Sequence, residues 1–248
     1  MNPLVTLTTD FGTRDGYAGA MKGVIHAHCP GVQVVDLTHD VPPGDVAAGA
    51  FALAQAAPWF PPGTVHVAVV DPGVGSSRRA LVVAGHGALF VGPDNGLLPP
   101  AAPGIARAID RIPPDWPIGR TFHGRDLFAR VAARLAAGAP VAELASEIVA
   151  PVRLGEARVE RSGDGLSGVV IHVDRFGNLV TNLPADAAGE IEVAGVRAVR
   201  EGSYADVAPG ELVAYVGSAG LVEVGVRDGS AAERLGIGRG AVVRARAG

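Results

Sequence analysis

The sequence predicts an α/β fold in which an N-terminal, mostly parallel sheet with flanking helices is followed by a smaller antiparallel β-barrel. In the first half, short β-branched segments alternate with helix-like segments, a pattern typical of strand–helix–strand units. In the second half, short β-rich segments are separated by turns that contain Gly and Pro. With 248 residues the chain is long enough for two domains, and we expect them at residues 1–155 and 165–248.

The N-terminal elements are predicted from segment length, hydrophobic pattern and end signals. Short apolar segments rich in β-branched residues are predicted strands, at 4–8, 32–37, 65–70, 80–84 and 88–91. Segments with helical periodicity are predicted helices, at 17–28, 45–57, 125–137 and 141–149. Asp45 is a predicted N-cap, and the uninterrupted apolar segment 65–70 predicts a strand that is buried on both faces.

The C-terminal elements are predicted strands because they are short, rich in aliphatic residues and bounded by turns. They lie at 166–173, 178–181, 190–194, 196–199, 212–216, 221–226 and 241–246. Strands of this length and spacing predict a small antiparallel barrel or sandwich.

Composition and charge exclude several classes of protein. Hydrophobic residues make up 48% and charged residues 19%, which excludes intrinsic disorder. The balance of 21 Lys and Arg against 25 Asp and Glu gives a net charge of −4, so we expect no nucleic-acid or membrane partner. The single cysteine, Cys29, cannot form an internal disulfide. We see no signal peptide and no apolar run of about 18 residues, so we expect a soluble, cytoplasmic protein.

Polar residues cluster where predicted strands end, the place where open α/β sheets bind ligands. Asp10 ends the first strand and is suited to bind a sugar diol, although a capping Asp in a turn explains it equally well. Asp36 lies near the end of the second strand, and His39 and Asp40 follow it. Two carboxylates that flank a His suit a metal site or a relay; a turn stabilised by Asp side chains is the alternative. The third strand delivers Asp71 to its end.

After Asp71, a turn rich in Pro and Gly returns the chain with Arg78 and Arg79. This is no Walker loop, because neither a GK[ST] motif nor a helix follows; an ion pair that only fixes the loop is the alternative. Asn95 lies in an Asn-Gly pair that also suits a hairpin turn. His123 precedes a predicted helix, and Gly124 beside it permits close approach of a ligand, as at a catalytic position.

Two further polar clusters lie in the second half of the chain. The bend at 174–182 holds more polar side chains than a turn requires, and the segment 217–220 precedes a strand. No CxxC or HExxH spacing is present, so we predict no metal site. Together the clusters predict a cleft with many hydrogen bonds, which is typical of a site for a small polar ligand.

Taken in order, several segments resemble one family, the S-adenosyl-L-methionine (SAM) hydroxide adenosyltransferases, or SAM hydrolases, which are related to fluorinating and chlorinating SAM halogenases. They are TTDFG, MKGV, VDPGVGSSRR, GPDNGLL, TFHGRDLFA, DRFGNLVTN and GSAGLVEV. The resemblance implies an N-terminal α/β domain, a C-terminal β-barrel and a homotrimer with active sites between the first domain of one subunit and the second domain of the next. It implies that water attacks C5′ of the SAM ribose and yields adenosine and methionine. SAM is then the substrate, and no cofactor is implied.

The resemblance also implies roles for individual residues. Asp71, Arg78 and His123 match the family's catalytic trio, and Asp10 matches the residue that holds the ribose hydroxyls. Further substrate-binding positions are Phe11, Asn95, Phe122, Asp174, Phe176, Asn178, Ser218 and Glu223. Among these, Asp174 and Ser218 match residues around the methionine amino group, and Asn178 matches an adenine contact.

Two details stay open at this stage. Ala219 stands where the halogenases carry Arg, so the partner of the methionine carboxylate is open, and either Arg78 or Arg79 faces the site. Two alternatives to hydrolysis are a halide adenosyltransferase, which makes a 5′-halo-5′-deoxyadenosine, and a SAM- or adenosine-binding module without turnover. In the halogenases the position that matches Asp71 is not acidic, and a Ser matching Gly124 helps to hold the halide.

Overall fold

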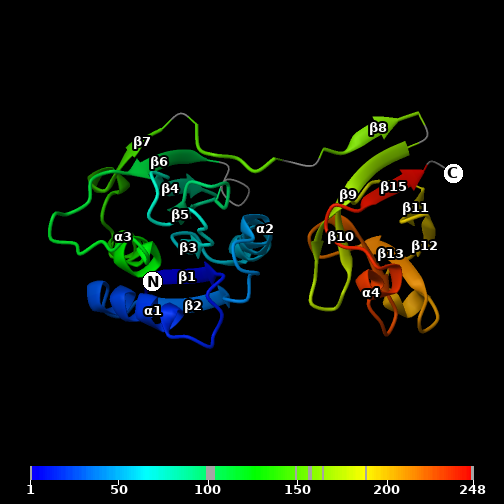
Figure 1. Cartoon of the computed structure of the whole chain (residues 1–248), viewed down its shortest axis with the longest axis horizontal. Helices are drawn as coiled ribbons and strands as arrows, with labels where there is room; N and C mark the ends of the chain where they lie inside the picture. The colour runs from blue at the N-terminus through cyan, green and yellow to red at the C-terminus, as the bar shows by residue number, and fades with distance from the viewer. Residues whose placement is uncertain are drawn as a thin grey trace. The chain divides into compact units, whose positions relative to one another are not determined.

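The computed structural model describes residues 2–98, 104–148, 150–155, 158–163, 165–187 and 189–246 (Figure 1). The chain divides into two compact units, Met1–Leu154 and Gly155–Gly248. None of the helices described is long and apolar enough to cross a membrane. Each unit has its own sheet and its own hydrophobic core, and each is described by itself below.

The first unit is built on a seven-stranded mixed sheet with the order β2-β1-β3-β5-β4-β6-β7. The parallel strands are β2 (Gln33–Thr38), β1 (Leu4–Thr9), β3 (Val65–Val69) and β5 (Ala88–Pro93). The antiparallel strands are β4 (Ala80–Gly85), β6 (Ile105–Ile109) and β7 (Ala145–Glu147). The α/β class is thus confirmed, although the sheet is mixed. His86 and Gly87, both with positive φ, join β4 to β5 in a tight hairpin that requires antiparallel pairing.

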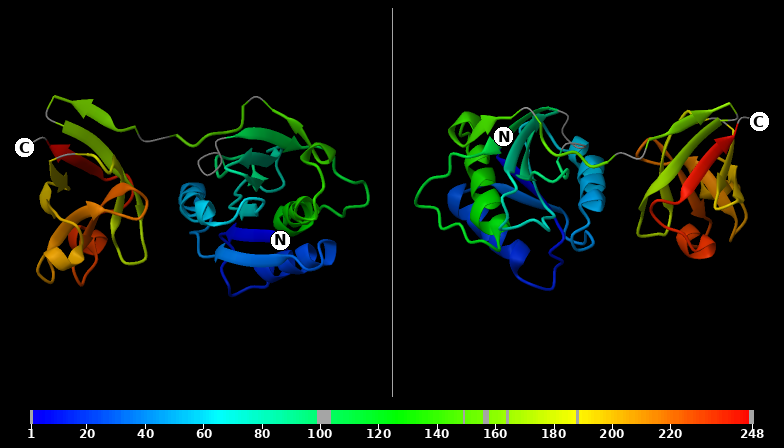
Figure 2. Two further views of the ribbon diagram at one scale, coloured as in Figure 1. Left: turned by 180° about the vertical axis from the view of Figure 1, so that it is seen from behind. Right: turned by 45° about the horizontal axis from the view of Figure 1, so that its top comes forward.

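Helices cover both faces of this sheet (Figure 2). On one face, α1 (Tyr17–His28) and α3 (Ala129–Ala136) share a core with side chains of β1 and β3. On the other face, α2 (Val46–Ala56) packs against a second core, and a short 3₁₀ turn, Ala57–Trp59, extends it. Asp45 caps α2 as predicted, because its side chain accepts a hydrogen bond from Ala48 N at 3.0 Å. All residues of β3 are buried, which confirms the prediction for this strand.

The predicted helix at 141–149 is wrong. A 3₁₀ turn, Val141–Glu143, is followed by β7, which pairs with β6; Val149 lies outside the described residues. Leu144 and Ala145 are buried in the core, and the edge of β6 offers hydrogen bonds along β7, so tertiary pairing overrides a helical sequence pattern.

The second unit is a closed barrel of seven strands with an eighth strand on its edge. The strands run in the order β10 (Leu179–Pro184), β14 (Leu221–Val226), β13 (Leu212–Val216), β12 (Val196–Arg200), β11 (Glu190–Val193), β15 (Val242–Arg246), β9 (Gly165–Val173) and β8 (Glu160–Ser162). Pairing of β9 with β10 closes the barrel. All pairs are antiparallel except β12 with β13.

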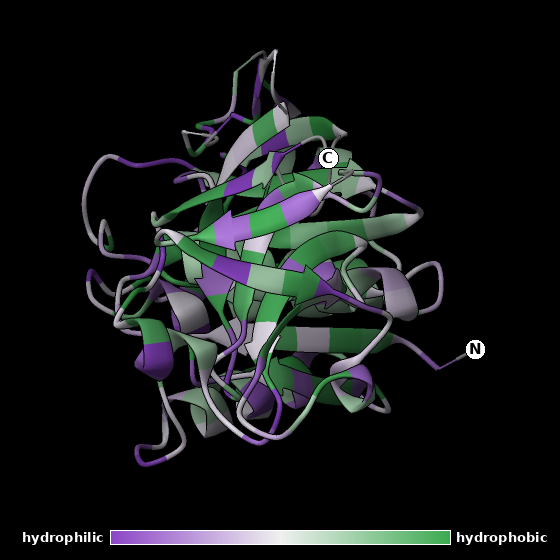
Figure 3. Cartoon of the chain, turned by 90° about the vertical axis from the view of Figure 1, so that its right-hand side faces the viewer, coloured by the Kyte–Doolittle hydropathy of each residue, from purple (hydrophilic) through white to green (hydrophobic). Residues whose placement is uncertain are grey.

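The barrel interior is filled by aliphatic side chains from alternate positions of the strands, such as Val222 and Val224 of β14. Figure 3 shows the same alternation as green and purple bands along the strands. Two short elements complete the unit, a 3₁₀ turn at Tyr204–Asp206 and helix α4 (Ala231–Leu235). The predicted barrel is confirmed.

Candidate active site

In the first unit, a pocket of about 240 Å³ opens where parallel strands end. Asp10 and Phe11 follow β1, Asp71 follows β3, and the segment 121–124 precedes a helix; these segments supply most of the lining. Because carboxyl ends of neighbouring parallel strands meet at one edge of a sheet, residues far apart in the sequence share this pocket. The remaining lining residues are Gly44, Val69, Pro72 and Val74.

Asp71, Arg78 and His123 are in direct contact. Arg78 Nε lies 3.0 Å from each carboxylate oxygen of Asp71, and Arg78 Nη2 donates to Oδ2 of the same group. The same Nη2 lies 2.8 Å from Nδ1 of His123. The side chains of Asp71 and Arg78 are 5% and 11% exposed, so the ion pair is largely shielded from water. Arg78 thereby fixes the orientation of both neighbours.

The chain turns sharply between Asp71 and Arg78, and this turn places the Arg78 side chain beside Asp71. Gly75 has φ +76°, and a Cβ there would lie 2.5 Å from the carbonyl oxygen of Arg120, so only glycine fits. Ser76 Oγ donates to Gly73 O at 2.6 Å and closes the turn.

Arg79 points elsewhere. Its Nε lies 2.6 Å from Oδ2 of Asp94, and its Nη2 lies 2.6 Å from the carbonyl oxygen of Ala150. The question that the sequence left open is therefore answered: Arg78 faces the pocket residues, whereas Arg79 ties the segment near residue 150 to the sheet.

Burial lowers the pKa of His123, and the positive charge of Arg78 lowers it further, with partial opposition from Asp71 and Asp126. The ring is therefore neutral near pH 7 and carries one N–H. Since a guanidinium group only donates, Nδ1 accepts from Arg78 and the proton resides on Nε2. His123 is thus a hydrogen-bond donor in this state and not a base.

The segment that carries His123 is held by a π-helical turn, Gly124–Phe128, which runs directly into α3. Asp126 anchors it, because Oδ2 accepts from Gly119 N at 3.0 Å and Oδ1 accepts from Arg125 Nε at 2.6 Å. Single π turns often occur at functional sites. The predicted helix at 125–137 thus contains a π-helical start and an α-helical remainder.

An aromatic cluster borders the pocket. The rings of Phe11 and Phe122 lie 5.7 Å apart in an edge-to-face arrangement, and Tyr17 lies 5.3 Å from Phe122. A Cβ on Gly124 would lie 3.1 Å from Phe122 and 3.3 Å from Phe11. The floor of the pocket is therefore tight around Gly124.

Of two further residues predicted to bind substrate, Asp10 lines this pocket and Asn95 does not. Asp10 lines the pocket, and its Oδ2 accepts a hydrogen bond from Gly44 N at 2.8 Å. Asn95 is not among the described residues that line this pocket. Its Nδ2 donates to Val70 O at 2.8 Å and its Oδ1 accepts from Leu97 N at 3.2 Å, so it shapes the loop after β5.

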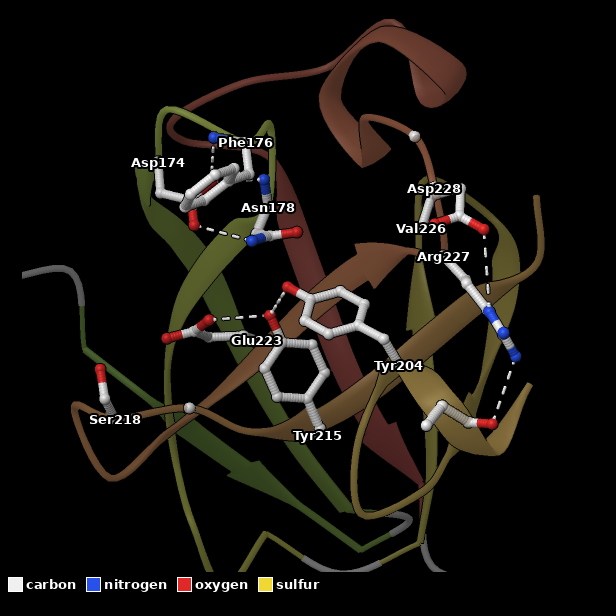
Figure 4. Close-up of a pocket in the computed structure, with 13 residues that line it drawn as sticks. Asp174, Phe176, Asn178, Tyr204, Tyr215, Ser218, Glu223, Val226, Arg227 and Asp228 are labelled. Atoms are coloured by element: carbon white, nitrogen blue, oxygen red, sulfur yellow. Dashed lines mark hydrogen bonds and ion pairs between the residues drawn. The ribbon is translucent and has the colours of Figure 1, made fainter. Parts of the chain in front are cut away.

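The second unit holds a pocket of about 770 Å³, which Figure 4 shows in close-up. The predicted residues that line it are Asp174, Phe176, Asn178, Ser218 and Glu223. Asp174 organises one wall, because Oδ1 accepts from the backbone N of Phe176 and Asn178 at 2.9 and 2.8 Å, and Oδ2 accepts from Asn178 Nδ2 at 2.7 Å. Phe176 is 77% exposed, so its ring is available to a ligand.

Sequence analysis missed several residues that line this pocket, among them Tyr204, Tyr215 and Arg227. The two phenol oxygens are hydrogen-bonded to one another, and Tyr215 Oη donates to Oε2 of Glu223 at 3.0 Å (Figure 4). Burial raises the pKa of Glu223; the Tyr215 hydrogen bond opposes this shift, and the charge of Asp174 adds to it. None of the three lies in a polar cluster or a Gly-rich turn, so nothing in the sequence marked them.

Arg227 is directed at backbone oxygens, with Nη1 at 2.7 Å from Val207 O and 3.3 Å from Ala205 O.

Among the described residues, no group of three or more His, Cys, Asp or Glu side chains is arranged to hold a metal ion. Both pockets are thus lined by hydrogen-bonding and aromatic side chains, which suits a small polar ligand with an aromatic part.

Comparison with known proteins assigns the class. Residues 5–145 match the SAM hydroxide adenosyltransferase N-terminal domain, and residues 168–244 match the C-terminal domain of the same family. The chain belongs to the SAM hydroxide adenosyltransferase family, as its motifs predicted.

Its relatives include proteins with two activities. A protein from Salinispora tropica named (R)-S-adenosyl-L-methionine hydrolase is 46% identical over 99% of this chain and 98% of its own length. A fluorinase from an Actinoplanes species is 32% identical over 73% of this chain and 72% of its own length. A crystal structure of an uncharacterized conserved protein from Thermotoga maritima superposes with a TM-score of 0.87 at 32% identity, over 97% of this chain and 99% of that one.

Proposed function

We propose that this protein hydrolyses SAM to adenosine and L-methionine. The observation that carries the proposal is the shielded contact of Asp71, Arg78 and His123 beside a pocket, in a chain 46% identical to a protein named (R)-S-adenosyl-L-methionine hydrolase. The reaction needs a water molecule that is oriented next to a proton acceptor; on this proposal Asp71 is the acceptor and the N–H of His123 orients the water.

The chemistry is a displacement at ribose C5′. A C5′–O bond forms to water as the C5′–S bond breaks, and its electron pair returns to sulfur, which becomes the neutral thioether of methionine. The sulfonium is already a good leaving group, so no general acid is required. The barrier lies in orienting water opposite the C5′–S bond, and holding reactants in that geometry contributes several kcal/mol.

Asp71 accepts the proton that water loses, since its carboxylate faces the pocket and Arg78 holds it in place. His123 donates its Nε2 hydrogen to the attacking oxygen and orients it, a role that fits the neutral ring better than proton acceptance does. Attack by a hydroxide-like oxygen on a sulfonium neutralises charge, so a pocket with little water favours the transition state over the charged ground state.

The substrate is bound, on this proposal, by residues of both units. Asp10 accepts hydrogen bonds from the ribose hydroxyls, with Phe11 and Phe122 beside the sugar. Asn178 contacts adenine and Phe176 stacks on it. Asp174, Ser218 and Glu223 surround the methionine amino group, where carboxylates favour a cation. The methionine carboxylate has no positively charged partner at Ala219.

The proposal includes a homotrimer in which the first unit of one subunit and the second unit of the next complete each site. It also includes a cytoplasmic location. The one cysteine, Cys29, is buried and free, as is common in proteins from reducing compartments.

The test is product analysis. Purified protein is incubated with SAM, with and without chloride, and the products are separated by chromatography. Adenosine and methionine in equal amounts support the proposal. A 5′-halo-5′-deoxyadenosine, the product class of the fluorinase relative, indicates the halide reaction instead. Binding of SAM without turnover indicates a module that only binds the ligand, and either result rejects hydrolysis.

A further inference from the structure

A buried hydrogen-bonded chain lies beneath the loop that carries Asp10, and the proposed reaction does not use it. Thr9 Oγ1 lies 2.8 Å from Nδ1 of His39, and the two residues are 0% and 6% exposed. The backbone N of Phe11 donates to Thr9 Oγ1 at 3.2 Å. The backbone N of Gly12 donates to the carbonyl oxygen of His39 at 2.8 Å. His39 thus contacts the loop at two points.

This series of side-chain contacts continues to the surface across β1 and β2, which are parallel neighbours (Figure 1). His39 Nε2 lies 3.0 Å from Oδ1 of Asp36, and Lys22 Nζ lies 2.5 Å from Oδ2. His39 Nε2 makes no hydrogen bond despite this short distance, so its contact with Asp36 is mainly electrostatic. Burial acts to raise the pKa of Asp36, but the contacts with Lys22 and His39 outweigh burial and lower it.

These contacts fix where each hydrogen lies. An ionised Asp36 carries negative charge and only accepts, so it favours the His39 tautomer whose N–H lies at Nε2, on the side of that carboxylate. Nδ1 then has a lone pair, and the Thr9 hydroxyl must donate to it. With its hydrogen committed to His39, Thr9 Oγ1 turns a lone pair to the N–H of Phe11. From His39 Nδ1 through Thr9 to the backbone N of Phe11, each group therefore has a defined role as donor or acceptor.

We propose that Thr9 and His39 are positioning residues that hold the Asp10–Phe11 loop in the conformation that binds the nucleoside. The inference rests on the proposed function. Asp10 and Phe11 both line the pocket; Asp10 contacts Gly44, and the backbone N–H groups of Phe11 and Gly12 contact Thr9 and His39. A loop that is already ordered before binding loses little conformational entropy when the ligand binds, so the ligand binds more tightly.

The same sheet contains a matched pair that serves as a control. Thr6 Oγ1 lies 2.8 Å from Nδ1 of His66, the same distance as between Thr9 and His39. Both threonines are 0% exposed and lie on β1. His66, however, packs between Phe60 and Phe90 and is not among the residues that line the pocket. Loss of either hydroxyl removes a buried Thr–His hydrogen bond, but only the Thr9 hydroxyl also accepts from a backbone N–H of the loop.

The experiment uses the full chain and adenosine as the probe. Thr9→Val and Thr6→Val each replace a hydroxyl by a methyl group of similar size, and Thr9→Ser keeps the hydroxyl. Titration calorimetry measures the Kd for adenosine, and thermal unfolding measures stability. We expect a lower Tm for both Val variants but a Kd raised about five- to tenfold for Thr9→Val alone, the effect of the hydrogen bond to the loop. Thr9→Ser should retain the wild-type Kd.

Two results overturn the inference. One is a wild-type Kd for Thr9→Val despite a lowered Tm. The other is an equal rise of Kd in Thr9→Val and Thr6→Val, which shows a general loss of stability. Failure of the proposed function gives a different result, since wild-type protein then neither binds adenosine nor releases it from SAM. KM for SAM follows the same pattern as Kd, with kcat changed less, because the loop contacts the sugar and not the reacting water.

Discussion

At the scale of single residues, Asp71 and Asp94 form a matched pair of buried carboxylates. Each is paired with one of two consecutive arginines, and their side chains are 5% and 2% exposed. Asp71 faces the pocket, whereas Asp94 holds Arg79 and the backbone N of Val152. A comparison of the two separates the chemistry of a carboxylate from its contribution to the fold.

We expect Asp71→Asn to retain SAM binding and to lose turnover. The amide keeps the size of the side chain but cannot accept the proton of water, and general-base catalysis typically contributes about 10²–10⁴-fold. Adenosine release gives kcat, and calorimetry gives the Kd for SAM. Asp94→Asn should lower the Tm and leave kcat within about twofold. Unchanged kcat in Asp71→Asn would remove Asp71 from the mechanism.

His66 makes stability depend on pH. Burial lowers its pKa from 6.5 to about 4, so the folded protein keeps the ring neutral while the unfolded chain binds a proton below pH 6.5. The unfolded state therefore gains protons first, and stability falls as the pH drops from about 6.5 to about 4. The full shift corresponds to roughly 3 kcal/mol.

His66→Gln removes this titrating group and leaves an amide near Thr6. Urea unfolding of both proteins at pH 7 and pH 4 gives the change in unfolding free energy for each. We expect the wild type to lose about 3 kcal/mol more than the variant over this range. Other titrating groups are common to both proteins, so equal pH dependence contradicts the assignment to His66.

At the scale of elements, the turn between β3 and β4 brings Asp71 and Arg78 together, and it depends on Gly75. Replacement by Ala adds two costs, a positive φ and a Cβ that meets the carbonyl oxygen of Arg120 at 2.5 Å. Gly31 also has a positive φ, +81°, but a Cβ there meets nothing within 4 Å. Gly31→Ala therefore measures the cost of the backbone conformation alone.

We expect Gly31→Ala to lower the unfolding free energy by about 1–2 kcal/mol with kcat unchanged. Gly75→Ala should cost more and also lower kcat, because the displaced turn moves Arg78 away from Asp71. Urea unfolding and adenosine release measure the two effects. Equal stability of the two variants, or full activity of Gly75→Ala, would show that the turn tolerates a side chain.

Elements with strong local signals were predictable from the sequence. Helix α1 has the predicted bounds, and Asp45 caps α2 as expected. The helix predicted at 141–149 failed because β7 pairs with β6 at the sheet edge. This contact joins distant residues, such as Arg107 and Glu147, and no local pattern records it. Strand β6 was also missed, because its sequence, IARAI, contains few β-branched residues.

The candidate site divides in the same way. Asp71, Arg78 and His123 lie in distinctive turns, so their segments were recognisable, and only the choice between Arg78 and Arg79 needed coordinates. Tyr204 and Tyr215 reach the second pocket from a 3₁₀ turn and from β13, and their pairing with Glu223 depends on how the barrel closes. Asn95 was expected to bind substrate; its side chain contacts the backbone of Val70 and Leu97, and its role in substrate binding stays a prediction.

At the scale of the whole molecule, the proposed site needs residues of both units. Each unit has its own hydrophobic core, so a fragment of residues 1–155 should fold. It lacks Asp174, Asn178 and Ser218, and we expect it to bind SAM too weakly for calorimetry to detect. Circular dichroism checks that the fragment is folded. Near-native affinity in a folded fragment would refute a substrate site that requires the second unit.

The whole active site also determines which nucleophile it accepts, and two positions favour water over halide. Asp71 places a carboxylate where an anion must lie, and two like charges about 4 Å apart repel by about 4 kcal/mol at an effective dielectric of 20. Gly124 offers no hydroxyl to hold a halide. Water carries no charge and benefits from a proton acceptor at the same place.

We therefore expect adenosine and methionine as the only products at physiological chloride concentration. In water labelled with ¹⁸O, mass spectrometry should find one labelled oxygen in adenosine, at the 5′ position, because the new C5′–O bond takes its oxygen from solvent. Gly124→Ser in the Asp71→Asn background is the matched variant, since it removes the repulsion and adds a hydroxyl. Detectable 5′-chloro-5′-deoxyadenosine from the wild type, or unlabelled adenosine, contradicts attack by water; chloride transfer that is confined to the double variant identifies these two positions as the barrier to halide.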